Sequence, residues 1–549
     1  MTGWKNTKRT VRIEVCDPNL RISRQRLTRA IQALHPGDDR QDRVMVAGLR
    51  MKPDILREAS ARAYEAGAAL LLAFEFQVHG LPDPLMPVID GVGLLPVPST
   101  VLGACASTDP VEQALSALPD AELEVALGAG ALPLVEALGG AVSAAGRLDI
   151  FERLIGMVHF EPDPYGCKGG LTGPELLAVL DTLDRRGAMF GERPAFAYGV
   201  RNWNRRSVAA ALGAPGSGVT FCREADEAIA AARRENGRVL AWAGQASPGH
   251  EASAQRAGVE FWRIEDGFLR SVGLGAGLVG GASYAVDPLG IYFDATRASR
   301  FEELVRGRNL SPSERRRARS LRSRLCDSGL TKYNLAAGEQ VAIPEGSGEL
   351  ILVPGQVSDD AGVRRTISDV IDCTGEENVN LALLRNVRAR NPSARILYKP
   401  HPDVEAGLRK GAIPDAEMAG LVDGIVRGAG ILETLHAVDR VETFSSLAGF
   451  EALLRDVPVT VHGMPFYAGW GVSEDLTLSP ARRSGGADLD TLVHAAYVDY
   501  PFCIDPLTLR PCPPEILLSR LSELRGSRGH RVAMGVRQRL SWLGRRIGI

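Results

Sequence analysis

Two adjacent carboxylates end an apolar run in the middle of the chain. Residues 259–264, VEFWRI, are followed by Glu265, Asp266 and Gly267. The run is typical of a buried strand, and in α/β folds ligands bind outside the carboxyl ends of parallel strands. A carboxylate beside another negative charge in a partly desolvated site can act as a general base. A solvated turn with a helix N-cap is the alternative, and the tripeptide alone does not decide between them.

A second acidic pair follows another predicted strand end. In VPGQVSDDAGVRR (353–365), Asp359 and Asp360 come shortly after Pro354 and Gly355. A carboxylate at such a turn can serve as a nucleophile or a metal ligand, or it can simply cap the next helix.

The segment YKPHPDVEAG (398–407) carries Lys399, His401 and Asp403 at alternating positions. In an extended chain these side chains would project to one side. A lysine and a histidine together can bind a phosphate and neutralise a leaving group. A metal site would need a second His or a Cys close by, and the segment has none. A structural role for His401 is the alternative.

Two further segments contain polar or aromatic groups next to predicted elements. Ser445 and Ser446 precede a periodic apolar helix, where hydroxyls and backbone N–H groups can bind an anion. Either serine could instead be an N-cap only. The aromatic loop GMPFYAGWGVSED (463–475) could stack on a base or a sugar, or could plug the space between domains.

The elements that position these residues alternate between strands and helices, which indicates parallel α/β sheets. Two such blocks, about 195–300 and 345–480, are joined by an Arg-rich helix at 311–325. Strands are predicted at 238–244, 259–264, 349–355 and 394–400, and helices at 224–236 and 380–391. A tandem of two α/β blocks predicts a site in the cleft between them.

Composition sets broad limits. The chain has 549 residues, which predicts two to four domains. A net charge of −2 gives no field that would favour nucleic acid, so no nucleic-acid partner is expected. The eight cysteines form no CxxC pair or zinc spacing, which indicates a reducing compartment. We expect no signal peptide and no transmembrane helix, and therefore a cytoplasmic protein.

Other nucleotide and metal motifs are absent or weak. There is no GxxxxGK[ST] motif, and GLGAG (273–277) lacks the GxGxxG frame. Asp488-Leu489-Asp490 formally matches DxD, a metal motif of some sugar-nucleotide transferases. It precedes a predicted helix, so we interpret it as an N-cap.

The first 190 residues weakly repeat the later chain. PVIDGVGLLPVPST (87–100) parallels YAVDPLGIYFDATR (284–297), which places Asp90 opposite Asp287. AFEFQV stands where RIEDGF stands in the later copy, and nothing corresponds to residues 345–470. Residues 1–190 are therefore predicted to be a shortened, degenerate α/β module.

Six segments together resemble the KpsC-type capsule polysaccharide biosynthesis family, the bacterial β-Kdo transferases. They occur in the family order within about 195–525: EDGFLRSVGLG, VDPLGIYFDATR, VPGQVSDD, YKPHPDVEAGLRKG, TFSSLAGFEALL and PFYAGWG. The resemblance implies a GT-B-like fold, with two Rossmann-like domains facing a cleft. It also implies transfer of Kdo from CMP-β-Kdo, without a metal or cofactor, to a lipid-linked β-Kdo acceptor.

The resemblance also implies roles for single residues. Asp360, in the element Gln356 to Asp360, would be the nucleophile of a double displacement, and Asp266 or Glu265 would deprotonate the acceptor hydroxyl. The donor would be bound by a further group: His401, Pro402, Lys399, Ser445 and Ser446. The first module lacks these elements, so one linkage type is expected, and Gly362 stands where Ser is common in the family.

These arguments divide the chain at three predicted boundaries. The predicted parts are the degenerate module (1–190), an acceptor-side domain (191–340), a CMP-sugar domain (341–495) and C-terminal helices with a basic amphipathic tail (496–549). From Arg525 onward there are seven Arg and no acidic residue. The tail is expected to bind an anionic inner-membrane surface, or alternatively to dock on the protein. We thus expect a peripheral membrane location.

Two other functions remain open at the level of sequence. One is a non-catalytic capsule assembly or export factor that interacts with other capsule proteins. Another is a GT-B transferase that uses a different CMP-sugar, such as a sialyltransferase-like enzyme. Retention of Glu265, Asp266, Asp360 and His401 favours the active β-Kdo transferase.

Overall fold

The structure is a computed structural model of the chain, which divides into two compact units, 1–183 and 184–549. Beyond the separate strands of the first unit, it describes residues 165–166, 171–214, 218–271, 280–331, 341–372 and 378–526. The basic tail from 527 onward and the Asp90 correspondence lie outside the described residues.

The first unit contains two sheets. One has the order β1-β2-β3-β4-β6, in which β2, β3 and β4 run parallel. Its strands are β1 (Thr2–Asn6), β2 (Arg9–Val15), β3 (Arg43–Gly48), β4 (Ala69–Ala73) and β6 (Leu95–Pro96). The other is antiparallel and consists of β5 (Met86–Ile89), β7 (Val158–Glu161) and β8 (Leu171–Thr172). Helix α7 (Gly173–Phe190) follows β8 and continues into the second unit.

The second unit begins with a seven-stranded sheet of order β10-β9-β11-β12-β13-β20-β21. The first four of these are parallel, and the last three are antiparallel to their neighbours. The strands are β9 (Ala195–Tyr198), β10 (Val219–Phe221), β11 (Arg238–Trp242), β12 (Glu260–Asp266), β13 (Ser283–Asp287), β20 (Pro501–Ile504) and β21 (Pro511–Cys512). Helices between or beside them are α8 (Asn202–Leu212), α9 (Ala225–Arg234), α10 (Pro248–Arg256) and α11 (Arg300–Val305).

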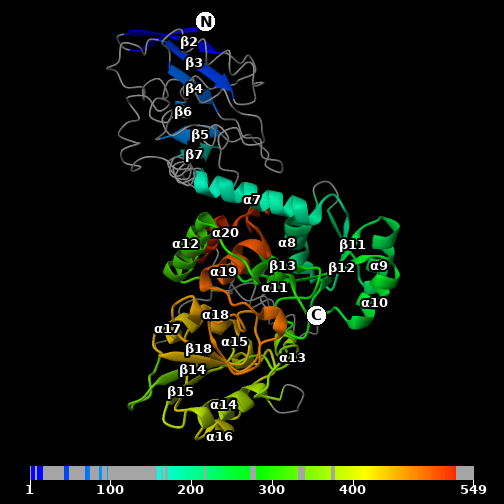
Figure 1. Cartoon of the computed structure of the whole chain (residues 1–549), viewed down its shortest axis with the longest axis vertical. Helices are drawn as coiled ribbons and strands as arrows, with labels where there is room; N and C mark the ends of the chain where they lie inside the picture. The colour runs from blue at the N-terminus through cyan, green and yellow to red at the C-terminus, as the bar shows by residue number, and fades with distance from the viewer. Residues whose placement is uncertain are drawn as a thin grey trace. The chain divides into compact units, whose positions relative to one another are not determined.

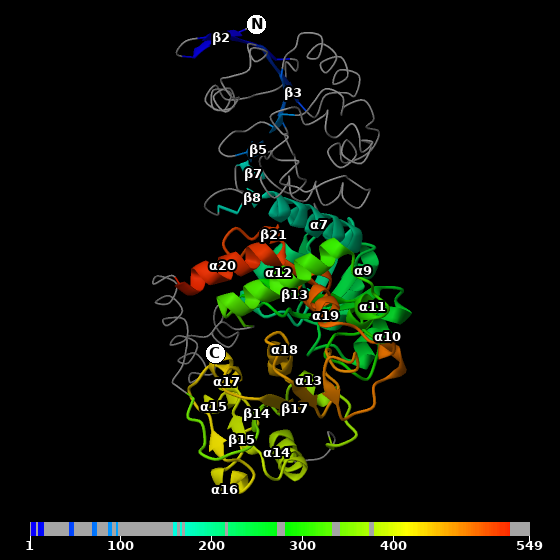
Figure 2. The same ribbon diagram turned by 60° about the vertical axis from the view of Figure 1, so that its left-hand side comes forward.

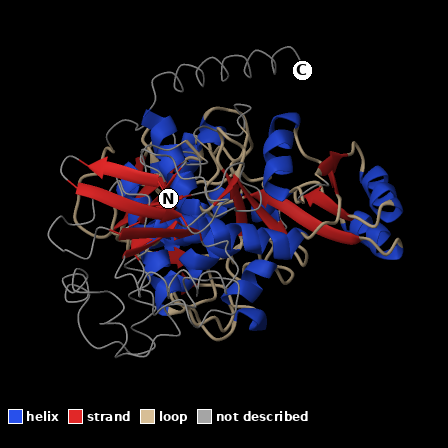
Figure 3. Cartoon of the chain, turned by 90° about the horizontal axis from the view of Figure 1, so that it is seen from above, coloured by secondary structure: helices blue, strands red, loops and turns tan. Residues whose placement is uncertain are grey.

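A six-stranded sheet follows, and all of its strands are parallel, in the order β16-β15-β14-β17-β18-β19. They are β14 (Leu350–Pro354), β15 (Arg395–Lys399), β16 (Gly424–Ile425), β17 (Arg440–Thr443), β18 (Val459–Val461) and β19 (Glu474–Asp475). Helices α13 (Ala361–Arg364), α14 (Val379–Arg390), α15 (Pro402–Glu405), α16 (Asp415–Met418), α17 (Ile431–Leu435) and α18 (Leu447–Leu453) connect them. In Figure 3 helices are blue and strands red, and Figure 1 labels both sheets.

We call the part of the second unit built on the seven-stranded sheet the first half, and the part built on the six-stranded sheet the second half. The sequence explains why the central strand β14 and strand β9 are continuous buried runs. All five residues of β14, LILVP, are buried, as are all four of β9. A parallel strand covered on both faces must bury every side chain, so no polar alternation is seen. The predicted α/β fold with two Rossmann-like domains is therefore confirmed.

The chain returns to the first half near its end. The sequence predicts helices from 496 onward, but residues 501–512 add strands β20 and β21 to the first sheet. Helix α20 (Pro514–Gly526) then lies beside the Arg-rich helix α12 (Pro312–Ser328) in Figures 1 and 2. Arg317 of α12 donates to Glu515 at 2.7 Å, and Arg319 donates to Asp490 at 2.7 Å. These arginines of α12 thus have internal carboxylate partners.

A buried aromatic cluster joins the two halves. Phe466, from the loop after β18, lies 4.6 Å from Phe268 and 5.1 Å from Phe301 between ring centroids. Both partners belong to the first half, whereas Phe450 of α18, 5.0 Å from Phe466, belongs to the second. Ring pairs at these separations are attractive beyond their burial of apolar area. Of the two hypotheses for the 463–475 loop, the contacts of Phe466 match the plug.

An ion-pair cluster reinforces this junction. Glu302 of α11 is 2 % exposed and accepts from Nε of Arg482 at 2.7 Å and of Arg483 at 2.6 Å. Both arginines follow the aromatic loop, in the 3-10 helix η4 (Ala481–Arg483). Arg483 also donates to the carbonyl oxygen of Ala468 at 2.9 Å. Because a buried carboxylate needs paired donors, Glu302 fixes the aromatic loop against the first half.

Candidate active site

The strand order of the second half has a switch point between β14 and β17. After β14 the chain proceeds to β15 and β16 on one side, and then to β17 on the other side of β14. Ligands of open α/β sheets bind outside the carboxyl ends of the strands at such a point. The residues that follow β14 and β17 are those that the sequence singled out.

A direct bridge spans this switch point. The side chain of Gln356, two residues after β14, accepts from the backbone N–H of Ser445 at 2.9 Å through Oε1. Its Nε2 donates to Oγ of Ser445 at 3.0 Å. Gln356 is 8 % exposed, so its amide is oriented by these two bonds in a nearly dry position. Two elements separated by 89 residues in the sequence are thereby brought into contact.

Asn380, in the first turn of α14, holds the backbone of Gln356. Its Oδ1 accepts from the N–H of Gln356 at 2.8 Å, and its Nδ2 donates to the carbonyl oxygen of Gln356 at 2.8 Å. Asn380 is 2 % exposed. Asn380 is not among the predicted site residues, although two asparagines at the start of a predicted helix are a usable signal for caps and backbone contacts.

Asp360 lies four residues beyond Gln356, at the start of α13. Its Oδ1 accepts from the backbone N–H of Gly362 at 2.9 Å, so Asp360 is the N-cap of that short helix. The side chain is exposed, and its Oδ2 has no hydrogen-bond partner among the described residues. Capping therefore occupies one carboxylate oxygen and leaves the other available for chemistry.

The neighbouring Asp359 has a different environment. Its Oδ1 lies 3.2 Å from Nη2 of Arg409, which comes from the turn after α15. This ion pair is partly exposed, with the two side chains 41 % and 32 % accessible. Asp359 thus has a cationic partner, whereas Asp360 has a backbone partner.

The segment that carries Asp360 also touches the first half. The backbone N–H of Ala295 donates to the carbonyl oxygen of Arg365 at 3.1 Å, and Nη2 of Arg365 donates to the carbonyl oxygen of Ala246 at 3.3 Å. Nη1 of Arg365 lies 3.7 Å from Oδ2 of Asp294. Asp360 is therefore presented where the two halves meet.

His401 and Pro402 begin α15 at the end of the adjacent strand β15. The Nδ1 of His401 accepts from the backbone N–H of Asp403 at 3.1 Å. A backbone N–H can only donate, so the neutral imidazole carries its proton on Nε2. Because the helix starts at Pro402, the extended geometry predicted through Asp403 is wrong, and the alternating residues do not share one side of a strand.

Lys399, the last residue of β15, is buried. It is 6 % exposed, and its Nζ donates to the carbonyl oxygen of Ala429. Burial lowers the pKa of this amine, while Glu405 and Glu433 oppose that shift. The backbone carbonyl of Lys399 accepts from Gly355 at 2.8 Å, so β15 ends beside the Gln356 segment.

Ser446 is the N-cap of α18, as the alternative for this serine pair stated. Its Oγ accepts from the N–H of Ala448 at 3.2 Å, and its carbonyl oxygen accepts from Tyr467 Oη at 2.6 Å. Gly449 allows this approach, because a Cβ there would lie 2.2 Å from the Tyr467 hydroxyl. The aromatic loop thus supports the serine pair as well as joining the halves.

The DxD match has a local role, because Asp488 caps α19 (Leu489–His494) as predicted.

Glu265 and Asp266 are the last two residues of β12, so they lie at the strand end as predicted and not in a turn after it. They pair with Ala285 and Tyr284 of β13, and successive residues of a strand face opposite sides of the sheet. Oδ2 of Asp266 accepts from Nε of Arg270 at 2.6 Å, and this arginine side chain is 2 % exposed. Oδ1 of Asp266 is buried without a hydrogen-bond partner among the described residues.

The two carboxylates end a strand of the seven-stranded sheet, whereas the Gln356 group follows strands of the six-stranded sheet. The link is Phe268, two residues after Asp266, which packs on Phe466. The two acidic pairs therefore lie on different halves of the unit.

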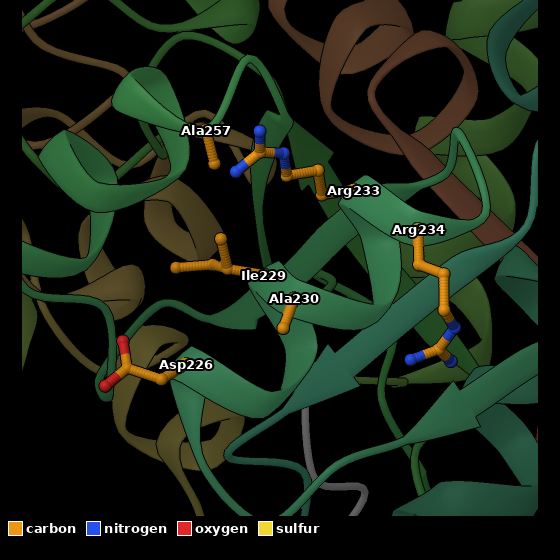
Figure 4. Close-up of a pocket in the computed structure, with 6 residues that line it drawn as sticks. All are labelled: Asp226, Ile229, Ala230, Arg233, Arg234 and Ala257. Carbon is orange, nitrogen blue, oxygen red and sulfur yellow. The ribbon is translucent and has the colours of Figure 1, made fainter.

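A surface hollow of about 480 Å³ lies elsewhere, on the outer side of α9 (Figure 4). It is lined by Asp226, Ile229, Ala230, Arg233, Arg234 and Ala257, none of which the sequence predicts to act in chemistry.

Among the described residues, no three His, Cys, Asp or Glu side chains are grouped to hold a metal ion. In the same described part, no helix is long and apolar enough to cross a membrane.

Residues 238–503 match the family described as capsule polysaccharide biosynthesis protein. Over these residues the chain is similar to that family. The matched segment runs from β11 into β20, and it contains the six-stranded sheet, part of the seven-stranded sheet and all predicted site residues.

Two named proteins are also similar to the chain. The chain is 37 % identical over 313 residues to the capsule polysaccharide modification protein LipA of Neisseria meningitidis serogroup B, covering 57 % of this chain and 43 % of LipA. It is 40 % identical over 260 residues to the lipopolysaccharide-processing protein LpsZ of Rhizobium meliloti, covering 46 % of this chain and 57 % of LpsZ. The chain thus spans about half the length of the curated relatives that it matches.

A solved structure is also similar. The β-Kdo 2,4 transferase of KpsC from Thermosulfurimonas dismutans is 28 % identical, with a TM-score of 0.51. The similarity covers 61 % of this chain and 99 % of that structure. The KpsC-type resemblance and the GT-B-like fold that the sequence predicted are therefore confirmed.

Proposed function

We propose that the chain is a retaining β-Kdo glycosyltransferase that moves Kdo from CMP-β-Kdo to a lipid-linked β-Kdo acceptor of capsular polysaccharide. The observation that carries the proposal is the Gln356–Ser445 bridge at the β14/β17 switch point. Asp360, with one oxygen without a partner in the described residues, lies four positions beyond it. The similar solved structure, the β-Kdo 2,4 transferase of KpsC, supplies the substrate class.

In the first step, Oδ2 of Asp360 attacks the anomeric carbon of Kdo. The bond between that carbon and the phosphate oxygen of CMP breaks, and CMP leaves with the bonding electrons. The product is a glycosyl ester on Asp360, and the configuration has inverted once.

In the second step, the acceptor hydroxyl attacks the same carbon and displaces the Asp360 carboxylate. A second inversion restores the original configuration, which is what retention requires. Asp266 or Glu265 takes the proton of the attacking hydroxyl. Only one of them can face the acceptor, because they project from opposite faces of β12.

The donor phosphate is bound at the carboxyl ends of β15 and β17. With Nδ1 of His401 accepting a backbone N–H, its Nε2–H is the donor that can reach a phosphate oxygen. The Gln356 bridge fixes the hydroxyl and the N–H of Ser445. Lys399, whose ammonium binds the carbonyl of Ala429, supports this edge from within the protein.

Gln356 acts as a positioning residue in this scheme. Both ends of its side-chain amide are bonded to Ser445, and its backbone is held by Asn380. The role of Gln356 is thus to hold the ends of β14 and β17 together around the donor. Metal independence, the lipid-linked acceptor and attachment of residues 527–549 to an anionic membrane stay predictions of the same proposal.

The first experiment is a transfer assay with the full chain. Protein, CMP-Kdo generated in situ and a synthetic β-Kdo-terminated lipid acceptor are mixed, and the mass of the acceptor is followed. A gain of one or more Kdo units supports the proposal. No gain despite measurable CMP binding would favour another CMP-sugar, and no gain without CMP binding would favour the non-catalytic capsule assembly or export factor.

A second experiment tests the donor site. His401→Ala should weaken CMP binding by about tenfold or more, because it removes a hydrogen bond to a charged phosphate. Isothermal titration of wild type and variant with CMP measures the change. Equal affinities would remove His401 from the donor site.

A further inference from the structure

A basic turn lies against the Asp359–Asp360 segment. This turn, residues 407–411 with the sequence GLRKG, follows α15. The backbone N–H of Ser358 donates to the carbonyl oxygen of Lys410 at 3.0 Å. Lys410 is therefore fixed through its backbone to a residue only two positions before Asp360.

The turn is anchored at several points. Nδ2 of Asn380 donates to the carbonyl oxygen of Gly411 at 2.9 Å, and Nδ2 of Asn378 donates to that of Ala412 at 2.9 Å. On the other side, the N–H groups of Leu408 and Arg409 both donate to the carbonyl oxygen of Asp403. An exposed turn with this many backbone bonds holds one conformation.

Gly411 makes the close approach possible. Its φ is +132°, and a Cβ there would lie 2.6 Å from the carbonyl oxygen of Gln356. The same Asn380 side chain therefore holds both the Gln356 segment and the basic turn. The nucleophile segment and the turn form one hydrogen-bonded assembly.

The charges of this assembly are unevenly matched. Arg409 forms the ion pair with Asp359. Lys410 is exposed, and its ammonium group has no hydrogen-bond or ion-pair partner among the described residues. Arg409 thus pairs with a carboxylate of the protein, whereas the ammonium group of Lys410 remains available in the segment next to Asp360.

The proposed donor creates a need for that cation. Kdo is a sugar acid whose carboxylate is attached to the anomeric carbon, so the nucleophile must approach a carbon that bears a negative group. Two carboxylates at short range repel each other strongly in a partly desolvated site. A neighbouring ammonium reduces this repulsion and holds the sugar in line for attack.

We infer that Lys410 binds the carboxylate of the donor sugar and so determines specificity for sugar acids over neutral sugars. The inference rests on the proposed function, because it takes Asp360 as the nucleophile. Arg409 is a positioning residue, which neutralises Asp359 and keeps it from adding a third negative charge. Asn380 positions both partners through its bonds to Gln356 and Gly411.

The experiment compares two ligands on three proteins. The dissociation constants of CMP and of CMP-Kdo are measured for the wild type, Lys410→Met and Arg390→Met. Arg390 is the matched control, an exposed cation at the opposite end of α14, paired with Glu474. Transfer by the wild type is followed in parallel with the mass assay, which tests the proposed function separately.

We expect Lys410→Met to bind CMP-Kdo at least about tenfold more weakly, while its affinity for CMP changes less than about twofold. Arg390→Met should match the wild type on both ligands. Unchanged CMP-Kdo affinity in Lys410→Met, or an equal loss for CMP, would overturn the inference while wild-type transfer leaves the function standing. A wild type without transfer or CMP-Kdo binding would overturn both.

Discussion

The two pairs of adjacent carboxylates that the sequence singles out, Glu265-Asp266 and Asp359-Asp360, have different surroundings. Glu265 and Asp266 lie inside strand β12, whereas Asp359 and Asp360 lie in the segment between β14 and α13. In each pair one aspartate is bound by an arginine, at 2.6 Å for Asp266 and 3.2 Å for Asp359.

The two arginines differ in burial. The Arg270 side chain is 2 % exposed and the Arg409 side chain is 41 % exposed. A buried ion pair is costly to break, whereas an exposed one contributes little. Adjacent carboxylates in a sequence are therefore not one type of site: a buried arginine holds Asp266, whereas an exposed arginine holds Asp359 and Asp360 has a backbone partner.

The largest expected effect separates the two members of the second pair. Asp360→Asn should lower kcat for transfer at least about 1,000-fold, because the amide is a poor nucleophile. Its affinity for CMP should stay within about twofold of the wild type. Asp359→Asn is the matched control and should retain most of the activity. Equal losses in both variants would contradict the distinction between them.

The next effect identifies the base in the first pair. Whichever of Glu265→Gln and Asp266→Asn removes the base should lower kcat by about 100-fold to 10,000-fold, and the other should change it little. The expected difference arises because the two side chains face opposite sides of β12. Steady-state kinetics with saturating donor measures it. If both variants lower kcat only slightly, neither Glu265 nor Asp266 is the general base.

The free energy of unfolding should depend more on the first pair of carboxylates than on the second. Arg270→Met leaves the mostly buried Asp266 carboxylate without its cation and should lower the free energy of unfolding by about 3–5 kcal/mol. Arg409→Gln breaks an exposed pair and should lower it by less than about 1 kcal/mol. Urea denaturation of both variants makes the comparison. Similar values would show that burial does not separate the two pairs.

The smallest effect concerns a third carboxylate, Glu251 of α10. Hydrogen bonds from Arg297, and then from Arg263, lower its pKa from an ordinary 4.5 to about 2. Because the pKa is lowered on folding, this group stabilises the fold above pH 4.5 and loses that contribution as the pH falls towards 2.

The urea midpoint of Glu251→Gln should therefore lie below that of the wild type at pH 7. The gap should shrink as the pH approaches 3. A gap that is constant with pH would show that the ion pairs of Glu251 are not the cause. The result would provide a partly exposed reference between the Asp266 and Asp359 pairs.

The sequence by itself determined the alternation of elements and the position of most strands and helices. Strands predicted at 349–355 and 394–400 are observed at Leu350–Pro354 and Arg395–Lys399, and the helix predicted at 380–391 is observed at Val379–Arg390. Local patterns were sufficient because a parallel strand is continuously apolar and a covering helix is periodic. The order of the motifs also predicted the resemblance to the KpsC-type family, which the comparisons confirm.

Only the tertiary structure decided what the site residues contact. The Gln356–Ser445 bridge joins positions 89 residues apart, and Asn380 and Arg270 gain their roles from partners that a local pattern does not reveal. The same is true of the aromatic loop, whose Phe466 joins the two halves. The physical reason is that strand order and burial, which set the neighbours and exposure of each polar group, arise only when the sheets assemble.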